Sequence, residues 1–201
     1  MSRQELAGAS RNGLVLAGTA WVALLMPTAG RLLWYRDRVV ADIHDPGRAF
    51  GFFTLAAGTN VLAVRSADDY RLLAVGLLAL GFVTGLLLAY AVPWTAVLSR
   101  TERPVLSEAD GTWFIWVVAV QSIATASAGL EPLVSTGRGE LAVVAVVAWS
   151  VGIVLYAACA VFVALRLLLY PLRPRDLDPP YWVAMGAAAI TVVAAAPKSS
   201  R

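Results

Sequence analysis

The chain has 201 residues, of which 59% are hydrophobic and only 14% charged, and its formal net charge is +3. Its mean hydropathy of +0.72 is higher than a soluble domain of this length needs, which argues against a soluble enzyme or binding domain. The charges are spread over loops without a basic stripe, so nucleic acid is not an expected partner. Long apolar runs must pair their backbone groups internally in lipid, and the composition therefore predicts an all-α, polytopic membrane protein.

One cysteine, Cys159, and one histidine, His44, limit the chemistry available to the chain. A lone cysteine forms no internal disulfide, and a lone histidine builds neither a bis-histidine haem site nor a zinc site of several histidines. The apolar segments contain no acidic residue or histidine for proton transfer, so an enzyme is not expected. We therefore expect no catalytic residue, no metal and no cofactor.

Six apolar segments follow one another, and residues 1–201 are expected to form a single transmembrane domain. The expected spans are residues 14–35, 49–64, 72–98, 112–130, 141–170 and 181–196. The first, third and fifth are long, whereas the second, fourth and sixth are short and rich in small residues. Long apolar helices can tilt and face lipid, while small residues let helices pack closely or surround a lumen. The pattern predicts an outer layer of long spans around an inner layer of short ones.

The starts of the three short spans are alike, which indicates an internal repeat. Each has an aspartate, then proline or glycine, then aromatic residues: Asp45-Pro46-Gly47 before Phe50, Asp110-Gly111 before Trp113, and Asp178-Pro179-Pro180 before Tyr181. The three aspartates are expected to be helix caps, because a carboxylate accepts hydrogen bonds from the free N–H groups of a first turn. The aromatic residues, together with Trp94, Trp113 and Trp182, are expected in the aromatic belt at the membrane interface.

Arginines concentrate in the loops that precede the short spans. These loops and their flanks hold Arg31, Arg36, Arg38, Arg48, Arg100, Arg103, Arg166, Arg173 and Arg175, whereas the opposite loops hold Arg65, Arg71 and Arg138. The positive-inside rule places the arginine-rich loops in the cytoplasm. Arg31 and Arg166 lie at the ends of spans, where they serve as membrane anchors or draw anions toward a pore.

Three stretches of the chain resemble a known family of membrane transporters. They are residues 53–62 (FTLAAGTNVL), residues 111–113 with 116–122, and residues 181–187 (YWVAMGA). Together they resemble the tellurite-resistance/dicarboxylate transporter family, which includes the plant slow anion channels. The resemblance implies ten transmembrane helices in five hairpins, inner helices that line a pore, trimeric assembly, and transport of anions including dicarboxylates such as malate.

The six spans match the family's second to seventh helices, so the chain is expected to be truncated at both ends. The gating phenylalanine on the family's ninth helix then has no counterpart here. We expect a multi-pass protein of the cell (inner) membrane that moves small anions as a passive channel or secondary carrier and forms a homo-oligomer. The alternative is a non-transporting membrane scaffold or a degenerate fragment of such a transporter.

Polar side chains within the short spans are the candidates for lining a pore. On the fourth span, Gln121 and Thr125 are four residues apart and share a helix face, which should turn toward other helices or a water-filled path. Neutral donors suit weak, multi-site contacts with an anion. The full set is Thr54, Thr59, Asn60, Gln121, Ser122, Thr125 and Thr191. The alternative role for each is a hydrogen bond between helices.

Overall fold

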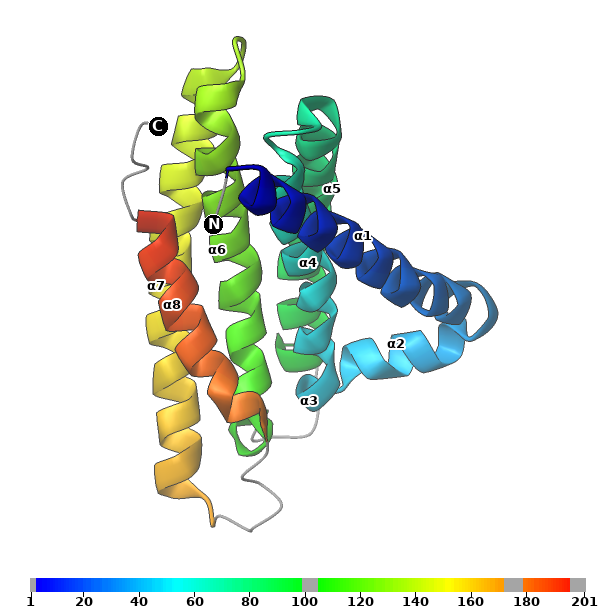
Figure 1. Cartoon of the computed structure of the whole chain (residues 1–201). Coiled ribbons are helices and arrows are strands. Elements are labelled where there is room, and N and C mark those ends of the chain that lie inside the picture. Colours follow the sequence, from blue (N-terminus) through cyan, green and yellow to red (C-terminus); the bar gives the residue numbers. More distant parts are fainter. Residues whose placement is uncertain (1–2, 99–104, 172–178, 196–201) are drawn as a thin grey trace.

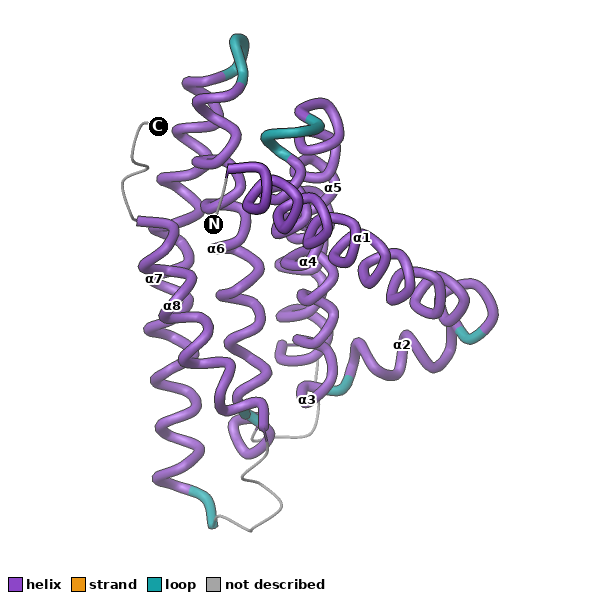
Figure 2. Tube along the Cα trace, viewed as in Figure 1, coloured by secondary structure: helices purple, strands orange, loops and turns teal. Residues whose placement is uncertain are grey.

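The structure is a computed structural model that describes residues 3–98, 105–171 and 179–195 (Figure 1). Within these ranges the chain is helical with short connections and has no strand (Figure 2). The helices are α1 (Arg3–Trp34), α2 (Arg36–His44), α3 (Pro46–Ala49), α4 (Phe53–Ser66), α5 (Arg71–Val92), α6 (Phe114–Leu130), α7 (Arg138–Leu169) and α8 (Val183–Ala195). Short 3-10 turns lead into three of them: η1 (Phe50–Phe52) into α4, η4 (Gly111–Trp113) into α6 and η7 (Pro179–Trp182) into α8.

Each of the six predicted spans coincides with a helical segment. Four segments are long and apolar enough to cross a membrane: Asn12–Trp34, Arg71–Thr95, Gly111–Leu133 and Arg138–Leu169. The second and sixth spans are shorter helices, with α4 continuing the helical backbone of α3 and η1, and Pro179–Ala195 forming a short apolar helix. The predicted class, an all-helical polytopic protein with alternating long and short segments, is confirmed.

Helix α6 lies at the centre of the bundle, where it contacts α4, α5, α7 and α8. Of its most apolar window, 61% is buried, compared with 28% for α5, 6% for α7 and 0% for α1. The long helices therefore form the exposed outer layer and α6 the interior, as their lengths predicted. Helix α8 packs on α6 and α7, and among its described residues only Ala187 is buried.

An aromatic cluster closes one end of the bundle, where α4, α6 and α8 all begin (Figure 1). The ring of Phe50 stacks on Trp113 at 4.9 Å between centroids, and Phe53 stacks on Trp116 at 5.9 Å. Trp113 is buried at 6% exposure, whereas Trp94 and Trp182 are exposed, and the place of all three in the interfacial belt stays a prediction. Trp113 is buried because the helix starts meet and cover each other's aromatic residues.

Helix α1 leans away from the bundle, and α2 runs back from its far end to α3 (Figure 1). The helix is unbroken from Arg3 to Trp34 although it contains Pro27. It contacts α4 through Trp21, whose indole Nε1–H donates to Thr59 Oγ1 at 3.1 Å. A groove lies between α1 and α4, and residues of α2 and α3 line it as well.

Candidate functional site

The polar residues of α4 and α6 meet inside the bundle. Asn60 Nδ2 donates to Ser122 Oγ at 2.9 Å, and Ser122 Oγ donates to the carbonyl of Ala119 at 2.6 Å. Asn60 is 0% exposed and Ser122 2%. Gly81 of α5 makes room for the amide, because a Cβ at this position would lie 2.7 Å from Asn60 Cγ. The two predicted residues therefore form one polar contact between α4 and α6.

Gln121 faces a different neighbour of α6, the helix α7. Its Nε2 donates to the main-chain carbonyl of Trp149 on α7 at 3.2 Å, and the side chain is 0% exposed. Gly152 of α7 leaves space for the Gln121 side chain, because a Cβ at position 152 would lie 2.6 Å from Gln121 Cδ. Adjacent residues of α6 thus bind two different neighbours, with Ser122 facing α4 and Gln121 facing α7.

Three buried oxygen atoms lack a hydrogen-bond partner within the described residues: Asn60 Oδ1, Gln121 Oε1 and Ser127 Oγ. Leaving such an atom unpaired costs on the order of 1–3 kcal/mol, so an accumulation of them in one bundle calls for a reason. Two of the three belong to residues that the sequence marked as pore candidates. Polar residues inside membrane helices are candidates for functional positions.

The four predicted threonines use their hydroxyl protons within their own helices. Thr54 donates to Gly51, Thr59 to Leu55, Thr125 to Gln121 and Thr191 to Ala187, at 2.7 to 2.9 Å between oxygen atoms. A hydroxyl has one proton to donate, so each of these keeps only acceptor capacity for other contacts. Anions need donors, and the amides of Asn60 and Gln121, each with two N–H groups, are therefore the stronger candidates for anion ligands.

The predicted cap residues lie at the helix starts. Asp45 precedes α3 and accepts a hydrogen bond from the backbone N–H of Gly47 at 2.9 Å. Asp110 precedes η4 and accepts from the N–H of Thr112 at 2.9 Å, and from its hydroxyl. Asp178 lies outside the described residues. The carboxylates satisfy first-turn N–H groups, which is how this residue type stabilises a helix start.

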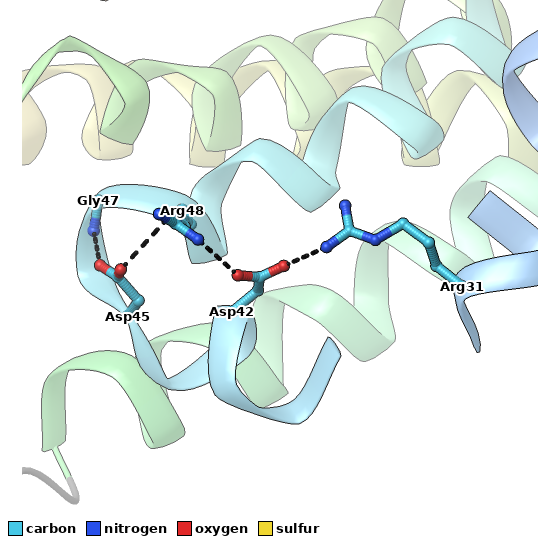
Figure 3. Close-up of polar contacts among 5 residues, drawn as sticks. All are labelled: Arg31, Asp42, Asp45, Gly47 and Arg48. Carbon is cyan, nitrogen blue, oxygen red and sulfur yellow. Dashed lines mark hydrogen bonds and ion pairs between the residues drawn. The ribbon is translucent and has the colours of Figure 1, made fainter. Parts of the chain in front are cut away.

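A second polar group, centred on Asp42, which was not among the sequence-based candidates, lies where α1, α2 and α3 meet (Figure 3). Asp42 of α2 binds Arg31 of α1 at 2.6 Å and Arg48 of α3 at 3.0 Å, and Arg48 also approaches Asp45 at 3.6 Å. The hydrogen bond from Arg48, supported by the one from Arg31, holds the pKa of the Asp42 carboxyl below its ordinary value. Asp42 has no periodic relation to either arginine, so no sequence signal pointed to it.

This ion-pair cluster stands at one end of the groove between α1 and α4. The groove has a volume of about 760 Å³, and its walls include Leu24, Leu25, Leu32, Leu55 and Gly58. A smaller cavity of about 190 Å³ lies between α7 and α8 and is lined by Ile153, Tyr156, Ala188 and Thr191. Of the predicted pore residues, Thr54 therefore lines the groove and Thr191 the small cavity.

Comparison with known proteins identifies the family. The sequence profile of the family described as voltage-dependent anion channel matches residues 5–200. The chain belongs to the voltage-dependent anion channel family. This match confirms the resemblance to slow anion channels and their transporter relatives that residues 53–62, 111–122 and 181–187 indicated.

Individual proteins similar to this member of the voltage-dependent anion channel family match it over a short segment. Two uncharacterized membrane proteins of Mycobacterium tuberculosis, MT1776 (strain CDC 1551 / Oshkosh) and Rv1735c (strain ATCC 25618 / H37Rv), are each 71% identical over 42 residues. This segment is 21% of the present chain and 21% of each relative, so the match spans about a fifth of their length. No solved structure matches the chain significantly.

Proposed function

We propose that this chain moves small anions across the cell (inner) membrane as a multi-pass protein. The observation that carries the proposal is membership of the voltage-dependent anion channel family over residues 5–200. The arrangement of the helices supports it, because a small-residue helix with buried amides, α6, lies inside a layer of long apolar helices. The described spans hold only neutral donors at these sites, so binding would be weak enough for an ion to leave again.

In this proposal the amides of Asn60 and Gln121 are the anion ligands. Both are sealed between helices at 0% exposure, so the described arrangement is a closed one. An ion reaches them only when α6 separates from α4 or from α7. Gly152 of α7 stands opposite Gln121, and the small interface that glycine makes between helices requires little side-chain rearrangement when α6 separates from α7.

The anion class and the assembly follow from the same reasoning. Neutral amides without a fixed positive charge favour monovalent inorganic anions in a passive channel, and dicarboxylates such as malate are the second class to test. Helix α8 exposes Met185, Val192 and Val193, and a homo-oligomer, a trimer as the resemblance implies, would place further copies around such surfaces.

The test is anion flux in liposomes that hold the purified chain, with chloride, nitrate and malate as the ions. Gln121→Leu and Asn60→Leu should lower flux at least about tenfold, because each removes a donor of a charge-assisted hydrogen bond. The matched control is Ser150→Leu, a polar-to-leucine change on the exposed face of α7. It should leave flux unchanged. Membrane abundance and thermal stability of each variant are measured in parallel.

A membrane scaffold without transport is the second candidate. One observation favours it: Asn60 and Gln121 already hydrogen-bond to Ser122 and Trp149, which is sufficient reason for polar residues between membrane helices. The scaffold role predicts no flux from well-folded protein, and it predicts that both leucine variants lose abundance and stability. Transport predicts a loss of flux that exceeds the loss of abundance.

A further inference from the structure

The groove between α1 and α4 has two chemically different halves. Its apolar half is walled by Leu24, Leu25 and Leu55, and Trp21 and Gly58 approach each other at one side of it. Its other half ends at Arg31, Asp42 and Arg48 (Figure 3). Helix α1 is a candidate membrane span with none of its apolar window buried, so the apolar half opens toward the hydrocarbon.

The charged half keeps donors free for a further ligand. The side chains of Arg31 and Arg48 are 57% and 69% exposed despite their ion pairs with Asp42. Arg31 gives a single hydrogen bond to Asp42 through Nη2, and a guanidinium carries five N–H donors. From residue 31 to residue 48 the chain carries four arginines and three aspartates, which leaves one net positive charge with His44 neutral. This end of the groove is therefore suited to an anionic group.

The depth of the two halves matches the two parts of a phospholipid. Arg31 lies in the last turn of α1, at the end of the Asn12–Trp34 span, where arginine reaches the headgroup layer. Leu24 and Leu25 of α1, which line the groove, precede Arg31 by about two turns and lie at hydrocarbon depth. The charged end of the groove therefore lies at the depth of a lipid phosphate, and its apolar part lies at the depth of an acyl chain.

We propose that the groove binds one anionic phospholipid, with the phosphate at Arg31 and Arg48 and an acyl chain between α1 and α4. The volume of about 760 Å³ falls in the range of sites for single small ligands. The exposed guanidinium groups of Arg31 and Arg48 favour an anionic lipid over an apolar helix from a second copy of the chain.

The test uses native mass spectrometry of the full chain in detergent, titrated with phosphatidylglycerol. Three comparison ligands separate the contributions: phosphatidylcholine with the same acyl chains, the matching diacylglycerol without phosphate, and glycerol 3-phosphate without acyl chains. We expect one phosphatidylglycerol per chain, bound at least about tenfold more tightly than any of the three, because each lacks the net charge, the phosphate or the apolar half.

Two variants remove the two halves of the site separately. The double variant Arg31→Gln/Arg48→Gln removes both guanidinium groups, and Gly51→Phe fills the groove from a position with nothing within 4 Å of its Cβ. Each should weaken phosphatidylglycerol binding about tenfold. The controls are Arg138→Gln, which removes an exposed ion pair with Glu131, and Gly76→Phe, which places the same ring on the exposed face of α5.

Each possible result decides the question. Selective loss in the two groove variants, with both controls unchanged and all proteins eluting as folded species, supports the lipid site. Equal phosphatidylglycerol binding by groove variants and controls overturns it. Displacement of the lipid by glycerol 3-phosphate alone would show an anion site without a lipid role. A dimer that dissociates in Gly51→Phe would show that a second copy covers the groove. If the arginine variant does not fold, Gly51→Phe alone decides the outcome.

Discussion

Replacing Gly111 with alanine tests whether the starts of α6 and α8 touch. A Cβ at Gly111 would lie closer than 3.0 Å to the carbonyl group of Pro180 and the backbone nitrogen of Tyr181. Ordinary contact begins at 3.4 Å, so the two backbones must separate by about 1 Å. Backbone atoms have no rotamer by which to move aside. We therefore expect the substitution to lower the free energy of unfolding by about 1–3 kcal/mol, as overpacking usually does.

Alanine substitutions at two other glycines serve as comparisons for the stability of Gly111→Ala. A Cβ at Gly152 would meet the side chain of Gln121, which can rotate, so Gly152→Ala should cost less than Gly111→Ala. Gly76 has nothing within 4 Å of its Cβ and lies inside α5, so Gly76→Ala should stabilise the protein by about 0.5–1 kcal/mol through its higher helix propensity. None of the three has a positive φ, so the comparison isolates steric contact.

The assay is equilibrium unfolding in mixed detergent–dodecyl sulfate micelles, with helix content by circular dichroism as the signal. The expected order of unfolding free energy is Gly76→Ala above the unmodified chain, then Gly152→Ala, then Gly111→Ala. Equal stability of Gly111→Ala and Gly76→Ala would refute the reasoning. In that case the helix starts do not meet, and the aromatic cluster at this end of the bundle has another arrangement.

Three further predictions rest on single side chains. Phe50→Ala should lower the unfolding free energy by about 3–5 kcal/mol in the same assay, because Phe50 is buried against Trp113. Asp42→Asn should cost about 1 kcal/mol or less, because its arginine partners are exposed, and should widen the distance between spin labels on α1 and α4. The lowered pKa of Asp42, due mainly to Arg48, means that its contribution is fully present above pH 3.8 and is lost as the pH falls further. Cys159 is buried, so it should resist maleimide in the folded protein and react after denaturation; rapid labelling of folded protein would contradict its position.

The helical segments were predictable because they depend on local properties. An uncharged apolar run of about 20 residues has to be a helix in lipid, whatever surrounds it. The same holds for the caps: Asp45 and Asp110 each accept from a backbone N–H two residues further along the chain. The candidate site was predictable to the same extent, since the sequence placed Asn60, Gln121 and Ser122 on interior helices. It did not indicate which of their neighbours they bind.

The partners of these residues required the tertiary structure because they are distant in sequence. Asn60 binds Ser122 across 62 positions and Gln121 binds Trp149 across 28. Helical periodicity assigns a side chain to a face, and it contains no information on which helix lies opposite that face. The burial of Trp113 has the same origin, because an aromatic residue at a helix start suits a membrane interface and a helix contact equally well.

By itself the sequence determined the class of the protein, the positions of its helical segments and their alternation of long and short, since these follow from hydropathy along one continuous stretch. Tertiary structure alone decided that Ser122 and Gln121 face different helices, that the helix starts form an aromatic cluster, and that Asp42 joins Arg31 to Arg48. The physical reason is that hydrophobic burial in a membrane drives single helices to form regardless of their neighbours. Contacts between helices depend on shape and hydrogen bonding between segments that meet only after the chain has folded.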